Sequence, residues 1–395
     1  KSMITVSEVI KNSCLRKYPV LCGLDGIENE VLKTGIIDYE FSIDGFIDQN
    51  KSFQYGDFLI SSLLFTHGDE EKLYQMLKKL VELGVSGLAI KDVFFPTIPE
   101  KAQKFCNENA FPLVLFDNGV YFEDIVNDID NLLQLSDWVN RVEQQIGIII
   151  GTELSRYEVE AISGDMGLSK LPYVMAYWLK PKMASSQTRM KQLIQSFSKN
   201  RYRKENCYLL KYKQNYLVLL NTNTNDKKKL RQAFNDVLEI AGLDLNEYVV
   251  GVSGVHCSIS ELDFSIKESV WSCQVAALLN ENIKHYGELG IWSIISAHHQ
   301  SKYMIDYMKK YLQPLLLDTS ESSKDLLETL IGFVSNQGNA KLIAKKLNIH
   351  ENTYRYRMNK LKEKLDPNAN EYVFYENASV AIKIYLLDLF DKSIK

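Results

Sequence analysis

The chain has 395 residues, of which 46 % are hydrophobic and 24 % are charged, and its formal net charge is −4. A chain of this length exceeds what one hydrophobic core usually holds, so we expect two or three domains with the composition of a soluble globular protein. No apolar run approaches the ~20 residues that cross a bilayer, and the N-terminus lacks a signal-peptide pattern, so we expect a cytoplasmic protein without a membrane partner.

The six cysteines form no C-x-x-C pair and show no disulfide spacing. They predict reduced, mostly buried thiols in a cytoplasmic protein. The pairs His256-Cys257 and His298-His299 are too sparse to indicate a zinc site, and we expect no metal and no cofactor.

Residues 3–120 alternate strand-like and helix-like segments. We expect strands over 20–23, 31–38, 58–64, 85–91 and 113–117, and helices over 70–83 and 100–109. Strands that alternate with helices predict parallel strands joined by right-handed crossovers. The sequence therefore predicts an α/β domain with a parallel sheet over residues 1–122.

Polar side chains follow three of these strands. Ligands of parallel α/β sheets bind beyond the carboxyl ends of the strands, so these side chains are candidates for holding a small polar metabolite. They are Ser61, Ser62, Lys91, Asp117 and Asn118. The alternative is that they are ordinary residues of surface loops.

The negative charge of this region argues against binding to nucleic acid. Residues 1–135 contain twelve Lys/Arg against twenty-one Asp/Glu. Because an acidic domain would not lie along DNA, we expect any DNA contact to come from elsewhere in the chain.

Residues 123–150 show a long helical pattern with a heptad spacing. The apolar positions are Ile125, Leu132, Leu135, Val139, Val142, Ile146 and Ile149, and only Asp128 interrupts them. Three heptads are near the minimum for a coiled coil, so the segment is either a dimerisation helix or a helix docked on its own domain. We favour the dimer.

Residues 151–296 show a second α/β pattern in βαββαβ order. We expect strands at 174–179 and 248–253, a hairpin over 207–220, and helices over 188–197, 227–241 and 261–279. This order is the ferredoxin-like arrangement of nucleotide cyclases. An active GGDEF-type cyclase would need glycine and acidic residues at the hairpin turn, where this chain has Lys213-Gln214-Asn215, so catalysis is not expected.

The remaining chain is helical. We expect a helix over 298–317 that ends near Pro314, a polar linker over 318–324, a helix over 326–336 and a closing helix over 377–390. Residues 297–324 would then connect the middle domain to a C-terminal domain over 325–395. Between the last two helices, 338–365 predicts two helices separated by a three-residue break.

This pair of helices has the pattern of a helix-turn-helix. Asn339 is placed to cap the first helix, whose apolar residues are Leu342, Ile343 and Leu347, and Asn348 can adopt the left-handed conformation that closes it. The second helix has Tyr354, Met358, Leu361 and Leu365 on one face, with Ala344 small enough for a close crossing. In a helix-turn-helix the second helix lies in the major groove.

Charge supports DNA as the partner of this segment. Residues 338–366 contain eight Lys/Arg against three Asp/Glu, in a chain that is acidic as a whole. The outward side chains include candidates for reading bases and for binding phosphates. The candidates are Lys345, Lys346, His350, Asn352, Thr353, Arg355, Tyr356, Arg357, Asn359 and Lys360. The alternative is an ordinary amphipathic helical pair with a solvated basic face.

The same segment resembles a known family, the PucR/CdaR-type transcriptional regulators. The matching signature is Ala-x-x-Leu-x-Ile-His-x-Asn-Thr-x-x-Tyr-Arg, from Ala344 to Arg357, and Glu351 departs from the basic or small residue usual at its position. The pieces YGDFLISS and LGVSGLAIK resemble the family's N-terminal sensor domain, although Ser61-Ser62-Leu63 lacks its usual glycine. The segment GVSGVHCSISELDFSIKESVWSCQVA resembles its degenerate GGDEF-like module.

The sequence thus predicts a multidomain α/β plus all-α protein: a parallel-sheet sensor, a ferredoxin-like middle domain and a helix-turn-helix. The resemblance implies a DNA-binding activator of catabolic or transport genes. Its partners would be a double-stranded operator, a small effector (an amino acid, purine catabolite or sugar acid) and a second copy of the chain. The alternative is a metabolite-processing enzyme fused to a DNA-binding domain. An acid/base pair for that enzyme would have to come from Ser61, Ser62, Lys91 and Asp117, with no well-placed histidine partner.

Overall fold

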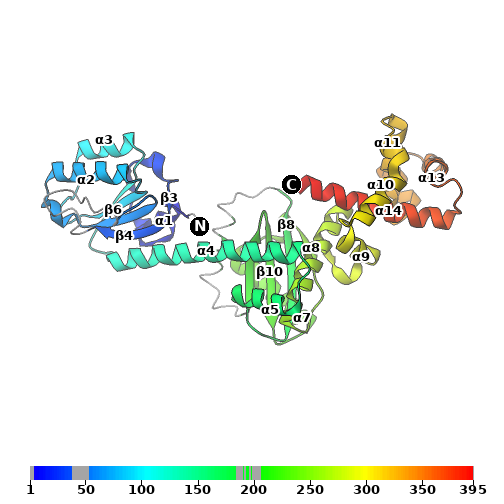
Figure 1. Ribbon diagram of the computed structural model, residues 1–395, viewed down its shortest axis with the longest axis horizontal. Coiled ribbons are helices and arrows are strands. Elements are labelled where there is room, and N and C mark those ends of the chain that lie inside the picture. The colour runs from blue at the N-terminus through cyan, green and yellow to red at the C-terminus, as the bar shows by residue number, and fades with distance from the viewer. Residues whose placement is uncertain are drawn as a thin grey trace. The chain divides into compact units, whose positions relative to one another are not determined.

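The computed structural model describes residues 4–37, 53–183 and 206–394, together with 190, 193, 194 and 197. The chain divides into two compact units, Lys1–Arg141 and Val142–Lys395 (Figure 1). The expected helix over 188–197 falls mostly outside the described residues. Among the helices that the structure describes, none is long and apolar enough to cross a membrane.

The first unit is built on a five-stranded sheet with the order β2-β7-β6-β5-β4. The strands are β2 (Val20–Cys22), β4 (Lys33–Ile37), β5 (Asp57–Ser61), β6 (Gly87–Lys91) and β7 (Leu113–Phe116). Neighbouring strands from β4 to β7 are parallel, and only β2 runs antiparallel to its neighbour. The helices α2 (Glu70–Glu82) and α3 (Glu100–Glu108) form the crossovers, so the predicted parallel α/β arrangement of this part is confirmed.

The largest differences from the predicted strand boundaries are at β4 and β5. The segment expected as one strand over 31–38 is divided: β3 (Glu30–Val31) pairs with β1 (Ile4–Thr5) in a separate ladder, and β4 begins at Lys33. Strand β5 ends at Ser61 because Leu63 adopts a left-handed backbone with φ 58°, which turns the chain into a short 3-10 segment. Position 38 lies outside the described residues.

The residues of the predicted heptad pattern all lie on one helix, α4 (Phe122–Gly151). Ile125 and Leu132 are buried in the core of the first unit, and Asp128 accepts a hydrogen bond from the backbone of Cys14 at 2.8 Å. Val142, Ile146 and Ile149 are also buried, while Leu135 and Val139 are only half-buried. Most of the seam is therefore covered by the chain itself, which favours the alternative of a helix docked on its own chain, and the dimer seam stays a prediction.

The second unit begins with another five-stranded sheet, of order β12-β11-β8-β10-β9. The strands are β8 (Tyr173–Pro181), β9 (Cys207–Tyr212), β10 (Asn215–Thr222), β11 (Tyr248–Val252) and β12 (Ile283–His285). The pairs β11-β8, β8-β10 and β10-β9 are antiparallel, and β12 is an additional parallel edge strand that the sequence pattern did not indicate. Helices α5 (Arg156–Asp165), α7 (Lys227–Ala241) and α8 (Leu262–Leu279) accompany this sheet.

Six helices complete the second unit. They are α9 (Ile291–His298), α10 (Lys302–Leu316), α11 (Glu321–Ser335), α12 (Ala340–Lys346), α13 (Glu351–Leu365) and α14 (Glu371–Ile394). The expected helix over 298–317 begins at Lys302 and ends at Leu316, near Pro314 as predicted. The expected linker over 318–324 holds the start of α11, which Ser320 caps. The closing helix starts six residues earlier than expected.

One continuous hydrophobic core joins these helices to the middle sheet domain. It runs from Val275 of α8 through Trp292 of α9 and Met308 of α10 to Leu361 of α13 and Phe374 of α14. The segment expected as a connector therefore packs as part of the helical domain, which fixes the position of α12 and α13 against α11 and α14.

Candidate nucleic-acid interface and ligand site

The turn between α12 and α13 is held by local hydrogen bonds. The Asn339 side chain accepts from the backbone of Leu342 at 3.2 Å, and Asn348 has a left-handed φ of 55°, so both predicted roles are confirmed. His350 caps α13, because its Nδ1 accepts from the backbone N–H of Asn352 at 3.2 Å. These contacts satisfy helix-end groups without any long-range partner, which explains why the sequence revealed them.

The inner face of the pair agrees with the prediction except at one position. Tyr354, Met358 and Leu361 are buried on α13, and Ile343 and Ala344 are buried on α12. Leu342, predicted to be part of the inner face, is 49 % exposed.

Helix α11 packs closely against α12 at Gly332. A Cβ added at Gly332 would lie 3.1 Å from Cγ2 of Ile343, so the Ile343 side chain would have to shift slightly to admit it.

The outer face of α13 carries the predicted polar side chains. Most of the candidate residues are exposed: Lys345, Lys346, His350, Asn352, Thr353, Arg355, Tyr356, Asn359 and Lys360. The Lys360 ammonium lies 5.4 Å from the centre of the Tyr356 ring. The α12–α13 pair thus presents a surface of cations, amides and one phenol, which are the groups that contact DNA bases and phosphates.

Arg357 does not belong to this surface. Its guanidinium donates to the Asp325 carboxylate, and its Nη1 lies 3.4 Å from Oγ1 of Thr329, both on α11. The expectation that Arg357 binds a phosphate is therefore corrected: it holds α13 against α11. The sequence could not show this, because Asp325 is 32 positions away.

Lys364 has a similar structural role. Its Nζ donates to Oδ2 of Asp318 at 2.6 Å and to Oγ of Ser323 at 2.7 Å. Hydrogen bonds from Lys364, Ser323 and Ser320 hold the pKa of the Asp318 carboxyl well below its usual range. Two of the eight basic residues of this segment, Arg357 and Lys364, therefore hold α13 against α11 and the turn that precedes α11.

Arg357→Ala is expected to lower the free energy of unfolding by about 1 kcal/mol, because the Asp325 carboxylate is 50 % exposed and the pair is only partly shielded from water. Urea unfolding of the full chain measures this loss. Arg355→Ala, on the exposed side of the same helix, serves as the control and should leave stability unchanged. An Arg357→Ala protein of unchanged stability with a reduced salt dependence of DNA binding would restore the phosphate role.

Ser61, at the end of β5, is a structural residue. Its side chain is fully buried, and its hydroxyl donates to the carbonyl of Ile37 at 2.8 Å while accepting from the backbone of Leu63 at 2.9 Å. The predicted ligand role of Ser61 is therefore wrong. Ser62 is half-buried and follows it.

The other candidates for ligand binding meet at the carboxyl ends of β6 and β7. Lys91 donates to the carbonyl of Val120 at 3.3 Å, and its ammonium lies 5.8 Å from the centre of the Tyr121 ring. Asp117 accepts from the Tyr18 hydroxyl at 2.6 Å and from the Gly119 backbone at 2.7 Å. The Tyr18 hydrogen bond lowers the pKa of the Asp117 carboxyl, and the charge of Lys91 adds to the effect.

This arrangement brings Lys91 and Asp117 together, with Asn118 exposed beside them. Tyr18 was missed, because it precedes the antiparallel edge strand β2 and no parallel-strand rule points to it. A cavity of about 200 Å³ in this unit lies near the amino ends of the strands instead, between Tyr55, Ser86 and Asn109.

The β9–β10 turn is occupied by contacts with α4. Glu143 of α4 accepts from the backbone N–H of Lys213 at 2.6 Å and from Nζ of Lys211 at 2.7 Å. A carboxylate therefore contacts the turn that lacks the glycine and acidic residues of a GGDEF-type cyclase. Within the part of the chain that the structure describes, no three His, Cys, Asp or Glu side chains gather in a way that could hold a metal ion.

Comparison with known proteins identifies two parts of the chain. Residues 8–133 match the purine catabolism regulatory protein-like family, and residues 326–384 match the PucR C-terminal helix-turn-helix domain. The chain therefore carries an N-terminal PucR-like domain and a PucR-type helix-turn-helix.

Curated relatives and a solved structure are similar to parts of the chain. The proline-responsive transcriptional activator PutR of Bacillus subtilis is 30 % identical over 117 residues, which are 29 % of this chain and 28 % of PutR. The DNA-binding transcriptional activator AdeR of the same organism is 24 % identical over 122 residues, 30 % of this chain and 29 % of AdeR. The matches thus span less than a third of either relative.

A regulator of polyketide synthase expression from Bifidobacterium adolescentis aligns over 63 % of this chain and 96 % of its own, at 15 % identity and a TM-score of 0.32.

Proposed function

We propose that the chain is a sequence-specific DNA-binding transcription regulator that activates catabolic or transport genes. The match to the PucR C-terminal helix-turn-helix supports DNA binding. PutR and AdeR are both described as transcriptional activators, which supports activation of the target genes.

One observation carries this proposal: the exposed face of α13. Asn352, Arg355 and Asn359 are exposed on the helix that a helix-turn-helix inserts into the major groove. Arginine can bond the two acceptors of a guanine edge, and asparagine can bond an adenine edge. Lys345 and Lys346 lie at the end of α12, where cations would meet the phosphates that flank the groove.

Arg355→Ala is expected to cost roughly 1–3 kcal/mol of binding to a promoter fragment and to relax sequence preference. Lys346→Ala should weaken all sequences alike and lower the slope of log affinity against log salt by about one. Fluorescence anisotropy at several salt concentrations measures both effects. If both variants lose only affinity that is independent of sequence, α13 does not read bases.

The N-terminal domain is proposed to bind a small polar effector: an amino acid, a purine catabolite or a sugar acid. The cation of Lys91 and the carboxylate and amide of Asp117 and Asn118 support such a ligand. Tyr18 bonds Asp117, and Ser62 follows the adjacent strand β5 at the same edge of the sheet. The description of PutR as proline-responsive supports a metabolite signal in this group of regulators.

A thermal-shift screen of these three metabolite classes tests this site. A ligand at a hundredfold excess over its Kd should stabilise the protein by ~2.7 kcal/mol. Lys91→Met should remove the shift, whereas Lys104→Met, on an exposed helix of the same domain, should preserve it. Equal shifts in both variants would place the ligand elsewhere.

The middle domain is proposed to be a non-catalytic, ferredoxin-like module. Its strand order β11-β8-β10-β9 and its three antiparallel pairings support this fold. The chain is further proposed to act as a homodimer, because one recognition helix contacts too few bases to find a site in a genome. The burial of the α4 seam moves the expected dimer contact to the second unit.

A further inference from the structure

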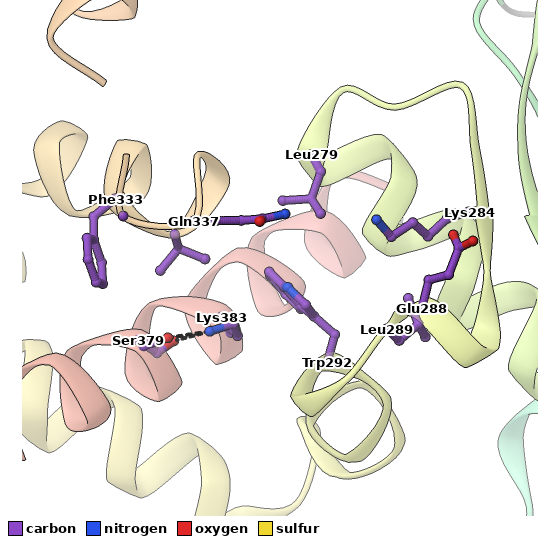
Figure 2. Close-up of a pocket in the computed structure, with 11 residues that line it drawn as sticks. Leu279, Lys284, Glu288, Leu289, Trp292, Phe333, Gln337, Ser379 and Lys383 are labelled. Carbon is purple, nitrogen blue, oxygen red and sulfur yellow. Dashed lines mark hydrogen bonds between the residues drawn. The ribbon is translucent and has the colours of Figure 1, made fainter. Parts of the chain in front are cut away.

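A cavity of about 310 Å³ lies between the middle domain and the helix-turn-helix domain (Figure 2). One wall is formed by Leu279 at the end of α8 and Trp292 of α9. The lining also includes Val334 of α11, Gln337 in the turn before α12, and Lys383 of α14. Its volume is within the range of small-molecule sites and is far larger than one inorganic ion requires.

Lys383 is the unusual residue of this cavity. Its side chain is 8 % exposed, and burial lowers the pKa of its ammonium. Nζ donates to the side chain and to the carbonyl of Ser379 and lies 5.6 Å from the centre of the Trp292 ring. Among the described residues Nζ has hydrogen bonds to Ser379 and no ion pair, so its charge is buried without the counterion that such groups normally have.

The other lining residues limit the charge and shape of a ligand that fits this cavity. Lys284 adds a second cation, which is already paired with Glu281 at 2.9 Å, and Glu288 adds a negative charge. One anionic group of the ligand can pair with Lys383, whereas a polyanion would be repelled by Glu288. Trp292, Leu279 and Val334 supply flat apolar surface for the remainder of the ligand, and the Gln337 amide can bond a polar edge.

We propose that this cavity binds a small organic monocarboxylate with a flat apolar body, whose carboxylate pairs with Lys383. This site is separate from the effector site proposed for the N-terminal domain. A ligand here would contact the middle domain together with the turn that leads into α12. Its binding would therefore favour the arrangement of the helix-turn-helix seen in this structure, which is how a second signal could reach the DNA-binding helices.

Benzoate is a suitable probe, with benzamide as its neutral isostere. Isothermal titration of the full chain should show benzoate binding about tenfold or more tighter than benzamide. Lys383→Met should reduce benzoate affinity by about tenfold or more, because it keeps the side-chain length and removes the charge. Lys392→Met provides the matched control on the same helix, since that lysine is 64 % exposed and pairs with Asp388, and it should bind benzoate normally.

Three outcomes would overturn the proposal. The first is the absence of benzoate binding to the unmodified chain at about 10 mM. The second is equal affinity of the unmodified and Lys383→Met proteins. The third is a loss of binding in Lys91→Met with none in Lys383→Met, which would assign the probe to the N-terminal domain. If Lys383→Met does not fold, Lys284→Met, at a half-buried lining position, should still weaken benzoate binding, and unchanged binding would count against the site.

Discussion

Gly251→Ala is expected to unfold much of the second unit, lowering the free energy of unfolding by about 3 kcal/mol or more. Gly251 lies in β11, where α8 crosses the sheet. A Cβ built on it would overlap the carbonyl oxygen of Ser269 and the backbone of Cys273, both on α8. Backbone atoms cannot move aside as a flexible side chain can, so the helix would have to separate from the strand.

Calorimetry of the full chain measures this effect. Gly164→Ala is the matched control, because a Cβ on Gly164 would meet nothing within 4 Å and the residue lies inside α5. Alanine there should be neutral or stabilising by up to about 1 kcal/mol. Equal stability of the two variants would show that α8 does not press against β11 as described. Because α8 contributes Val275 to the core shared with α13, the Gly251→Ala protein should also lose DNA binding.

Leu132→Asp is expected to destabilise the first unit by about 4 kcal/mol or more, since a buried carboxylate shifts its pKa by 3–5 units and each unit is worth 1.36 kcal/mol. Leu132 is 4 % exposed and packs in the core that contains Ile125 and Ile129. A coiled-coil seam predicts a different result, namely folded monomers.

Calorimetry together with light scattering separates these outcomes. Gln134→Asp, on the exposed side of the same helix, should leave both stability and mass unchanged. A Leu132→Asp protein that keeps its first unfolding transition but loses half its mass would restore the dimer seam. The structure predicts the opposite: loss of that transition, with any dimer contact in the second unit preserved.

The sequence predicted best what depends on neighbouring residues. The caps at Asn339 and Asn348 and the alternation of strands and helices in the first unit are local features, and they stand as expected. The heptad in α4 left two interpretations open because a helix docked on its own chain and a coiled-coil helix bury residues with nearly the same period. Strand β12, with three residues, is too short to produce a pattern.

The errors at the candidate sites have one physical cause. Arg357 and Ser61 are polar residues in segments that were expected to bind partners. Only the fold shows that Arg357 donates to Asp325 and that Ser61 donates to Ile37. The cavity around Lys383 could not be predicted from the sequence for the same reason. Its walls come from Leu279, Trp292 and Gln337 as well, positions up to 104 residues from Lys383 along the chain. Tertiary contacts of this kind leave no periodic trace in a sequence.

The central claim, that α13 reads sequence, is tested most directly by selecting binding sites from a pool of random duplexes with the full chain and with Arg355→Lys. Lysine keeps the charge of arginine but cannot make its two-pronged hydrogen bond. We expect the unmodified chain to enrich a defined sequence, and the variant to lose preference at one position while it still binds DNA. Identical enriched sequences from both proteins, or no enrichment by either, would contradict this account.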